Sequence, residues 1–345
     1  MKAIVLTGIR QMEMVNVPEP TIKKDDEVLL KIEVVGVCGS DVHYYETGRI
    51  GSQIVKYPFV VGHECAATVE AIGGAVTRVK VGDSVVVEPA IACNDCDQCK
   101  RGRKNTCRNL KFLGCPGQAE GCLCEYIVMP EYCCFPVDGK KITFEQGVLC
   151  EPLAIGVYAV KQACLPKNAA IAILGTGPIG LSCLVSAKAE KIKTCYVTEK
   201  IEERAEAAKK NGATWAGNPD KENIIKEILK LEPAGVDVVF ECAGQQETID
   251  QAVELLKPGG KLMLVGIPRL ERISFMIDKI RRKEIAIINV RRQNECTQTA
   301  IDLIAGGKVN VDFMITHRFK LEQAQQAFDM VTGYRDGVIK ALIEL

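Results

Sequence analysis

Four cysteines lie close together between residues 93 and 107, in the run CNDCDQCKRGRKNTC. The spacing C-x2-C-x2-C-x7-C lets neighbouring thiolates converge on one ion, while backbone amides in the short gaps can donate to their sulfurs. Four sulfurs close a tetrahedral site with no open position, so the sequence predicts a structural zinc that stabilises a lobe with little core of its own. The predicted ligands are Cys93, Cys96, Cys99 and Cys107.

The residues alone leave two other interpretations of this cluster open. An iron–sulfur cluster also takes four thiolates, but the wide last spacing and the absence of a Cys-Pro ending fit it poorly. Four unligated thiols are the other alternative. The chain has 17 cysteines in all, many within apolar runs such as LSCLV and TCYV. This distribution favours buried free thiols in a reducing cytoplasm over a disulfide framework.

A second set of potential ligands is spread over three segments, GVCGSDVH, GHE and LCEPLA. These segments supply Cys38, His63, Glu64 and Glu151. A thiolate, an imidazole and a carboxylate leave one position for water or substrate, as a catalytic zinc requires. The chain has only 3 histidines, which narrows the choice of imidazole. An isolated histidine is often a hydrogen-bonded structural residue, so the residue types alone leave zinc ligation by His63 open.

The segment AAIAILGTGPIG has the pattern of a dinucleotide-binding turn, an apolar strand followed directly by G-x-G-x-x-G. One glycine makes the tight turn, one lets the backbone approach a pyrophosphate, and one packs helix against strand. The three glycines are Gly175, Gly177 and Gly180. The next predicted strand ends at Glu199, where an acid bonds the ribose 2′-hydroxyl of NAD. Lys200 and Arg204 follow closely, so NADP stays open, as does a glycine turn without a ligand.

The pattern of apolar residues changes near residue 150. Before it, short alternating segments such as MKAIVL, EVLLKIEVV, CAATVEAI and DSVVVEP indicate a strand-rich, barrel-like unit with few helix signals. After it, apolar strands alternate with helical periodicity, including helices from Pro178, through EERAEAAKK and over 296–305. This alternation predicts an α/β unit with a parallel sheet covered by helices. The closing segment GVIKALIEL is strand-like and is expected to return to the first unit.

Length and charge limit the classes of function. A chain of 345 residues exceeds what one core usually supports, so two domains are expected. The 44 basic residues balance 44 acidic ones, which argues against nucleic acid or a membrane surface as a partner. No stretch is long and apolar enough to span a membrane, and the first residues are too short an apolar run for a signal peptide.

Taken together, the motifs resemble the zinc-containing medium-chain dehydrogenases and, within them, the sorbitol and xylitol (polyol) dehydrogenases. The resemblance extends from about residue 36 to 319 and is carried by GVCGSDVHYYETGRIG, PFVVGHE, VVVEP, LCEPLAIGVYA, GTGPIG, LLKPGGKLMLVG and THRF. It implies a GroES-like β-barrel catalytic domain formed by residues 1–150 and 288–345. A Rossmann NAD-binding domain, residues 151–287, is then inserted as a doubly wound parallel sheet, with the active site in the cleft between the two. A homotetramer, or else a dimer, is also implied.

The resemblance assigns roles around the catalytic zinc. It implies that Cys38, His63 and Glu64 are ligands. Glu151 resembles the acid that holds the zinc-bound water, and it would ligate the metal directly or through that water. Asp41 resembles the acid that orients the ligand histidine. A departure is Cys150, whose thiol could compete for the metal.

The stretch after Cys38 resembles a proton relay and a substrate contact. Ser40 would accept the proton of the alcohol and His43 would receive it through the cofactor ribose, although His43 could equally be a surface or packing residue. Tyr44 resembles a substrate-contacting residue but could also line the cleft or belong to the core. His317 is interpreted as structural.

Further positions are implied to contact cofactor or substrate. The cofactor set adds Ile179, Arg204, Val265, Gly266, Ile267 and Arg291 to the glycine turn and Glu199. Arg291 is also implied to contact substrate. The next residue is commonly Tyr in the animal enzymes but is Arg292 here, which changes the charge and hydrogen-bonding reach expected of the substrate pocket.

The resemblance therefore implies a small-molecule polyol substrate. The two sets of potential ligands predict two zinc ions, one catalytic and one structural. Zinc would act as a Lewis acid, Ser40 would accept the proton, and hydride would pass from a secondary carbinol of sorbitol, xylitol or L-iditol to NAD, giving a ketose. The same chemistry on a 2,3-diol, threonine or a phosphorylated polyol remains open, since Arg291 and Arg292 would suit an anion. A zinc-free quinone reductase and a non-catalytic NAD-binding protein are the remaining alternatives.

Overall fold

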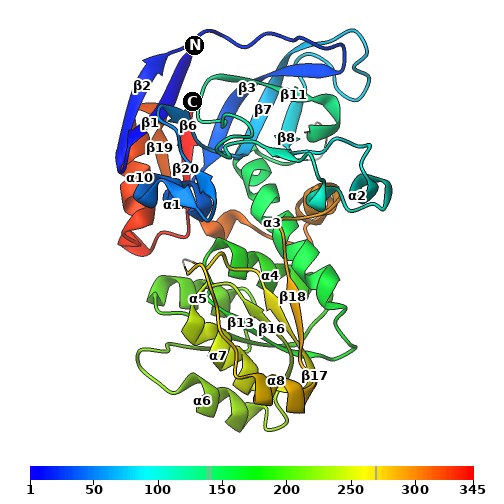
Figure 1. Ribbon diagram of the computed structural model, residues 1–345, viewed down its shortest axis with the longest axis vertical. Coiled ribbons are helices and arrows are strands. Elements are labelled where there is room, and N and C mark those ends of the chain that lie inside the picture. The colour runs from blue at the N-terminus through cyan, green and yellow to red at the C-terminus, as the bar shows by residue number, and fades with distance from the viewer. Residues whose placement is uncertain (138, 140, 269) are drawn as a thin grey trace. The chain divides into compact units, whose positions relative to one another are not determined.

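The computed structural model describes residues 1–137, 139, 141–268 and 270–345, and its contacts divide them into two compact units (Figure 1). The first unit contains Met1–Glu151, Thr297–Gly307 and Val311–Leu345, and the second contains Pro152–Cys296 and Lys308–Asn310. The first segment of the first unit ends at Glu151, whereas the prediction ended it at residue 150. The second boundary lies later than the predicted residue 288, because β18 (Ala286–Asn289) pairs with β17 (Leu256–Leu264) inside the sheet of the second unit.

The first unit is built on a seven-stranded sheet with the order β12-β8-β7-β3-β20-β19, in which β11 also pairs with β3. Smaller sheets, β2-β1-β6, β10-β9 and β4-β5, accompany it. The closing strand β20 pairs antiparallel with β3, so the end of the chain returns to the first unit as predicted. The strands of this unit are β1 (Lys2–Gly8), β2 (Gln11–Asn16), β3 (Glu27–Gly36), β4 (Arg49–Ile50), β5 (Gln53–Ile54), β6 (Phe59–Val60), β7 (Glu64–Ile72), β8 (Ser84–Val87), β9 (Ala90–Ile91), β10 (Lys111–Phe112), β11 (Tyr126–Pro130), β12 (Cys134–Pro136), β19 (Ile315–Lys320) and β20 (Lys340–Glu344).

Alternation of apolar side chains fixes the register of the central strands. Along β3, Val28, Leu30 and Ile32 are buried in the core of the first unit while the residues between them are more exposed. The antiparallel pairing of β3 with β7 then sets Gly36 opposite Glu64. The carboxyl end of β3 and the start of β7 therefore meet at one edge of the sheet, and both segments continue into predicted zinc ligands.

Helices of the first unit include one that the sequence did not predict. The helix α1 (Gly39–Thr47) begins directly after Cys38, in a region where few helix signals were expected. Its sequence, GSDVHYYET, contains few strong helix formers, so tertiary packing rather than intrinsic propensity maintains it. The other helices of this unit are α2 (Asp97–Lys100), α9 (Thr297–Ala305) and α10 (Ala324–Thr332).

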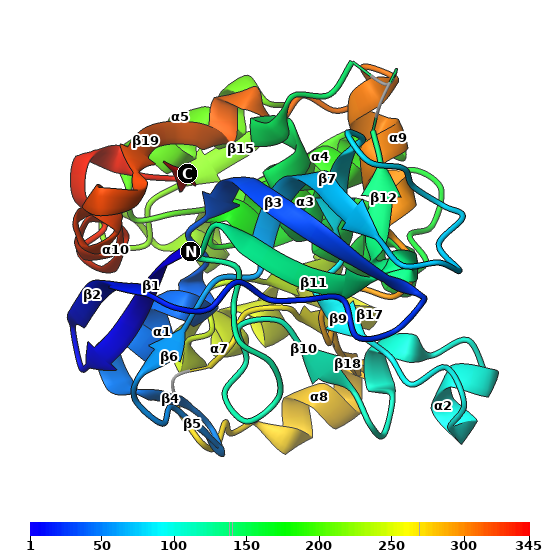
Figure 2. The same ribbon diagram turned by 90° about the horizontal axis from the view of Figure 1, so that it is seen from above.

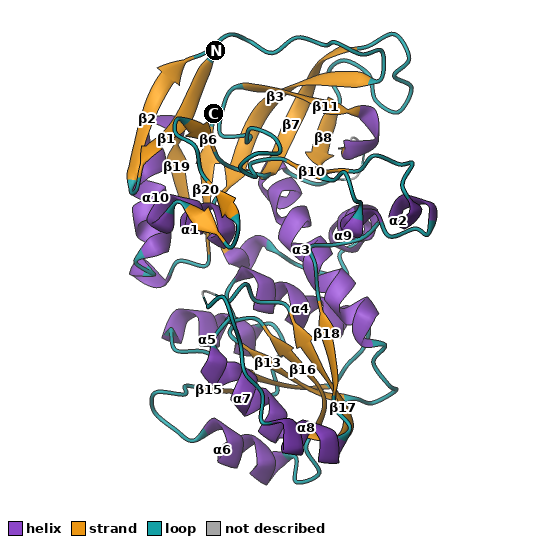
Figure 3. Ribbon diagram, viewed as in Figure 1, coloured by secondary structure: helices purple, strands orange, loops and turns teal. Residues whose placement is uncertain are grey.

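The second unit has a six-stranded, all-parallel sheet with the order β15-β14-β13-β16-β17-β18 (Figure 3). Numbered from β13, this is the 3-2-1-4-5-6 order of a dinucleotide-binding Rossmann fold, and the predicted α/β class is confirmed. All of β13 is buried, as expected for a central parallel strand covered on both faces. The remaining elements are β13 (Ala170–Leu174), β14 (Thr194–Thr198), β15 (Trp215–Gly217), β16 (Val236–Glu241), α4 (Pro178–Ala189), α5 (Glu202–Lys210), α6 (Ile224–Leu231), α7 (Gln246–Leu255) and α8 (Ile277–Lys283). One further helix, α3 (Phe144–Ala163), contains the boundary between the units.

The cysteine-rich segment forms a lobe of the first unit. Its short helix α2 lies at the outer edge of that unit in both Figure 1 and Figure 2. Its hydrophobic cluster consists only of Ala92, Cys99 and Cys107, with Cys93, Cys96 and Leu110 packed against them. Apolar burial therefore contributes little to this lobe, as the sequence suggested. Within the described residues, no helix has both the length and the apolar character that crossing a membrane requires.

Candidate functional site

Three of the predicted catalytic ligands converge in the first unit. One ligand atom each from Cys38, His63 and Glu64 can be chosen so that all three lie within 4.8 Å of one another. Cys38 lies between β3 and α1, and Glu64 begins β7, so the register of β3 with β7 brings these segments together. A thiolate, an imidazole and a carboxylate at this spacing fit one zinc ion with a fourth position available to another oxygen.

The imidazole of His63 is oriented by Asp41. The distance from Nδ1 of His63 to Oδ1 of Asp41 is 3.2 Å, and the same carboxylate oxygen accepts the backbone N–H of Gly62 at 3.3 Å. A proton on Nδ1 leaves Nε2 as the nitrogen for a metal. The ring also packs against Phe112, with centroids 5.3 Å apart. Asp41 is fully buried and lies where the resemblance implied.

The electrostatics of this centre favour a cation. Burial lowers the pKa of His63, but Asp41 and then Cys38 raise it, and the net result is a pKa well above the usual value. In addition, Oε1 of Glu64 is buried and no described residue forms a hydrogen bond with it. A buried anionic oxygen without a donor costs free energy unless a cation accepts its lone pairs. The donor set and its charge therefore fit a zinc ion.

Glu151 lies beside this centre but outside the group of three. It is 6% exposed, and no described residue bonds its Oε2. Burial raises the pKa of Glu151 to about 8, with His63 lowering it and Glu64 raising it further. Glu151 therefore interacts electrostatically with two of the three predicted zinc ligands. Cys150 does not compete among the described residues, because its thiol donates to the backbone oxygen of Gln146 (3.5 Å) and stays outside the group.

Sequence reasoning missed Lys340, which lies in β20 and is 1% exposed. Its Nζ is 2.6 Å from Oε2 of Glu64 and 3.2 Å from the backbone oxygen of Val37. A lone lysine between apolar residues in VIKALI was the available signal, since lysine is almost never fully buried unless it is paired.

The relay and substrate residues lie on α1. Ser40, His43 and Tyr44 are spaced i, i+3 and i+4, so they share one side of the helix. The hydroxyl of Ser40 donates to Sγ of Cys38 at 3.3 Å, which places it next to a predicted ligand. Tyr44 is 4% exposed, and its hydroxyl donates to Oε1 of Gln53 at 3.0 Å. His43 is half-buried, and its backbone oxygen accepts the hydroxyl of Thr47.

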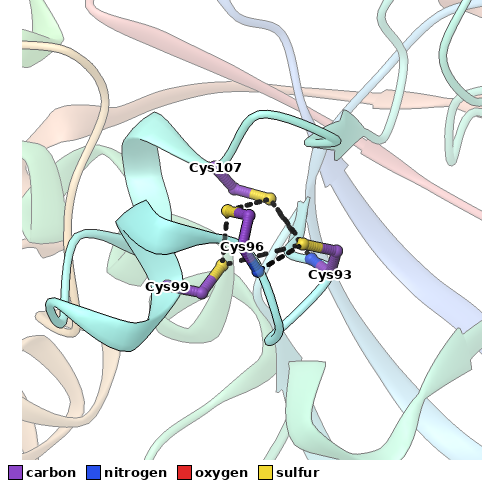
Figure 4. A group of neighbouring side chains, drawn as sticks. All are labelled: Cys93, Cys96, Cys99 and Cys107. Atoms are coloured by element: carbon purple, nitrogen blue, oxygen red, sulfur yellow. Dashed lines mark hydrogen bonds between the residues drawn. The ribbon is translucent and has the colours of Figure 1, made fainter.

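The four cysteines of the lobe form a closed group (Figure 4). The Sγ–Sγ distances are 3.4 Å between Cys93 and Cys107, 3.6 Å between Cys96 and Cys99, 3.9 Å between Cys96 and Cys107, and 4.0 Å between Cys93 and Cys99. Zinc–sulfur bonds of about 2.3 Å in a tetrahedron place the sulfurs about 3.8 Å apart, so these distances fit one zinc ion. Backbone hydrogen bonds, from Asp95 and then from Cys96, lower the pKa of Cys93 to about 6, which favours the thiolate that binds metal.

The glycine turn of the second unit has the geometry expected of a pyrophosphate site. Gly175 has φ of +92°, in the left-handed region, and a Cβ on Gly180 would lie 1.9 Å from the backbone oxygen of Gly175. Gly177 is the N-cap of α4 and Ile179 lies in its first turn, so the backbone N–H groups of the helix start remain available to an anion.

The acid at the end of β14 anchors the glycine turn. Oε2 of Glu199 accepts the backbone N–H of Thr176 at 2.8 Å, and Oε1 accepts those of Lys200 at 2.8 Å and Ile201 at 3.0 Å. Arg204 in α5 is buried, and its Nη1 lies 3.5 Å from where a Cβ on Gly177 would be.

The other predicted cofactor residues follow β17 and β18. The N–H groups of Val265 and Gly266 both donate to the backbone oxygen of Glu241, which holds this segment against the end of β16, and Ile267 is 49% exposed. Arg291 is exposed, and Arg292 has a left-handed backbone with φ of 54°. Neither arginine belongs to the unit that contains the candidate catalytic zinc centre.

Comparison with known proteins identifies the family. The family model for the alcohol dehydrogenase GroES-like domain matches residues 24–139, and the model for zinc-binding dehydrogenases matches residues 178–306. The sorbitol dehydrogenase of Bacillus subtilis (strain 168) is 37% identical, covering 99% of this chain and 97% of its own. The D-xylulose reductase A of Aspergillus niger is 35% identical, covering 99% of this chain and 96% of its own. The chain belongs to the zinc-containing medium-chain dehydrogenases, in their polyol branch.

Solved structures agree with the fold of this dehydrogenase. A zinc-binding dehydrogenase from Sinorhizobium meliloti 1021 bound to NADP has a TM-score of 0.89 and 30% identity, covering 100% of this chain and 99% of that one. An Escherichia coli CFT073 alcohol dehydrogenase complexed with NADH has a TM-score of 0.90 and 27% identity, with the same coverage. Zinc and a nicotinamide cofactor are therefore the family's cofactors, and the GroES-like and Rossmann folds are confirmed.

Proposed function

We propose that this dehydrogenase uses zinc and NAD to oxidise a secondary hydroxyl of a polyol of the sorbitol, xylitol or L-iditol type to a ketone. The observation that carries the proposal is the convergence of Cys38, His63 and Glu64 within 4.8 Å in a chain of the polyol branch. Three protein ligands leave a position for a substrate oxygen, which a closed site would not.

The residues around the centre have separate tasks in this proposal. When bound, zinc would supply Lewis acidity to the substrate hydroxyl and NAD would supply the hydride acceptor. Ser40 accepts the hydroxyl proton, and its position 3.3 Å from Sγ of Cys38 supports that role. His43 is the proposed next acceptor, and Tyr44 the proposed contact to a distal hydroxyl.

We propose that Glu151 holds a water molecule or the adjacent substrate hydroxyl rather than ligating zinc directly. Its position outside the three-residue group and its buried, unpartnered Oε2 support this. Burial also raises its pKa to about 8, so in the metal-free site the carboxyl keeps its proton at neutral pH.

The proposed cofactor is NAD rather than NADP. The carboxylate of Glu199 would repel a ribose 2′-phosphate. Lys200, the nearest cation in sequence, forms an ion pair with Asp220 in which Nζ and Oδ1 are 2.7 Å apart, so it is already engaged by an acid. The residues proposed to bind NAD are Gly175, Gly177, Ile179, Gly180, Glu199, Arg204, Val265, Gly266, Ile267 and Arg291.

We assign the four-cysteine group to a structural zinc, which the sulfur distances and the small core of the lobe support. Each chain then carries two zinc ions. We also propose a homo-oligomer, a tetramer or else a dimer, which analytical ultracentrifugation would test. None of the 17 cysteines, all of which the structure describes, forms a disulfide, which supports a cytoplasmic location.

The experiment that tests the function is NAD reduction over a panel of substrates, with zinc measured on the same sample. The panel contains sorbitol, xylitol, galactitol, 2,3-butanediol, threonine and a phosphorylated hexitol, each with NAD and with NADP. We expect the highest kcat/KM with an unphosphorylated pentitol or hexitol and NAD. Preference for the phosphorylated hexitol, in which Arg291 and Arg292 would hold the phosphate, would replace the proposed substrate. NAD binding without turnover of any substrate would overturn the proposal.

A further inference from the structure

Lys340 is a buried cation in a strand that is otherwise apolar. Its neighbours Ile339, Ala341 and Leu342 are buried, and Lys340 is itself 1% exposed. Transfer of an ammonium group out of water costs several kcal/mol, and a paired buried ion is often no more stabilising than an apolar residue of similar volume. Stability alone therefore does not explain a lysine at this place.

The contacts of Lys340 connect two of the three segments that supply metal ligands. Nζ lies 2.6 Å from Oε2 of Glu64 and 3.2 Å from the backbone oxygen of Val37, which directly precedes Cys38. The ion pair is buried on both sides. One ammonium group thus fixes the carboxylate of one ligand and the peptide that leads into another, although β20 is more than two hundred residues away from both in the chain.

The contact also distinguishes the two oxygens of Glu64. Oε2 is occupied by Lys340, whereas no described residue bonds the buried Oε1. Lys340 thus holds the carboxylate through Oε2, and Oε1 is the oxygen that no described residue bonds and that could ligate a metal.

Charge gives a second reason for a cation here. Cys38 and Glu64 supply two negative charges as ligands, and the carboxylate of Asp41 is buried nearby. Among the described residues of the first unit, Lys340 is the only lysine or arginine that is buried. Its ammonium group offsets part of this excess negative charge and pairs directly with the carboxylate of Glu64.

We infer that Lys340 is a positioning residue of the catalytic metal centre, which fixes Glu64 through Oε2 and leaves Oε1 as the ligand atom. The inference rests on the proposed function in taking Glu64 as a zinc ligand. It predicts that Lys340 acts on zinc through Glu64 and not through the stability of the fold. The four-cysteine group of the same chain serves as an internal reference, because the hydrogen bonds described for the Lys340 ammonium group go to Val37 and Glu64 instead.

The test measures zinc per chain and the rate of zinc release to a chelator in the full-length protein and its Lys340→Met variant. We call the site of Cys38, His63 and Glu64 the open centre. We expect Lys340→Met to release zinc from the open centre about 10- to 100-fold faster, as is typical for residues that orient metal ligands, and to keep the four-cysteine zinc. The matched control is Lys283→Met, since Lys283 donates to the backbone oxygens of Val253, Glu254 and Leu256 in the second unit. This variant should release zinc at the wild-type rate. Wild-type zinc retention in Lys340→Met would overturn the inference.

A double variant keeps the test decisive if Lys340→Met does not fold. Glu64→Gln with Lys340→Met removes both charges, which is less costly than leaving one buried charge unpaired. If Lys340 acts through Glu64, the double variant should release zinc no more than about twofold faster than Glu64→Gln alone. A further tenfold loss would show a role independent of Glu64 and would contradict the inference. Failure of the proposed function is recognised separately, because the wild-type protein would then hold no zinc at the open centre or turn over no polyol.

Discussion

The two candidate metal centres of the first unit are built in opposite ways. The ligands of the closed centre, Cys93 to Cys107, come from one short segment with a cluster of three buried residues as its core. The open centre takes Cys38, His63 and Glu64 from the meeting ends of two strands, with Lys340 added from the last strand of the chain. The first centre can organise a loop with local sequence alone, whereas the second requires the register of a whole sheet.

The surroundings of the two centres differ as much as their ligands. In the closed centre the sulfurs receive backbone N–H groups, for example from Cys93 to Cys107 at 3.3 Å and from Cys96 to Cys93 at 3.4 Å. In the open centre buried side chains provide the support, Asp41 for His63 and Lys340 for Glu64. A centre with one position free for substrate has fewer protein ligands, so its geometry depends more on such supporting residues.

The strongest way to separate the two centres is to remove His63. His63→Ala takes one of three ligands from the open centre, so we expect one zinc per chain instead of two. Turnover should fall by on the order of 10³-fold or more, because a Lewis-acid metal supplies several kcal/mol of transition-state stabilisation. The control is His317→Ala, whose ring bonds Thr316 and Asp336 and which should keep two zinc ions and its activity. Full activity of His63→Ala would remove the basis for calling this centre catalytic.

Replacing Glu151 separates a role in catalysis from a role in binding zinc at the open centre. Glu151→Gln keeps the shape of the side chain but removes its acid function, so polyol turnover should fall by about 10²-fold. If Glu151 acts through water, as proposed, the variant still holds two zinc ions, measured by atomic emission. Loss of one zinc would instead indicate that Glu151 is a direct ligand.

Replacing Asp41 tests how strongly zinc binding at the open centre depends on the residues that orient its ligands. Asp41→Asn keeps an oxygen for Gly62 but weakens the acceptor that orients His63. Its zinc affinity at the open centre should fall by about 10- to 100-fold in competition with a chelator, while the four-cysteine zinc stays bound. Equal loss at both centres would point to a general change of fold.

The smallest effect on turnover is expected at the closed centre. Cys96→Ser should lose the four-cysteine zinc and lower the unfolding temperature, yet change kcat by less than about tenfold, because distant sites contribute independently. The control Cys164→Ser replaces an exposed thiol and should change neither zinc content nor unfolding temperature. A turnover loss as large as that of His63→Ala would erase the distinction between the centres.

The sequence predicted the features whose determinants are local. The cysteine spacing indicates its own site, and the glycine turn with Glu199 follows from residues within one strand–turn–helix segment. The strands of the first third were also predictable, because β3 and β7 carry alternating apolar residues.

What escaped prediction depends on contacts between distant segments. The helix α1 has weak propensity, and α3 contains Pro152, a residue that normally argues against a helix interior. The partnership of Lys340 with Glu64 joins the last strand to β7, and no local pattern specifies which acid a buried lysine will find. The second domain boundary was placed inside β18 for the same reason, since edge-strand pairing is not visible in a single segment.

The most direct test of the account uses the Cys96→Ser variant, in which only the open centre holds zinc. Zinc is removed in steps with a chelator and restored in steps, and zinc per chain and polyol-dependent NAD reduction are measured on each sample. The account predicts that activity rises in proportion to zinc between none and one ion per chain and returns when zinc is restored. Activity that persists in the zinc-free protein, or that fails to follow the zinc content, would contradict it.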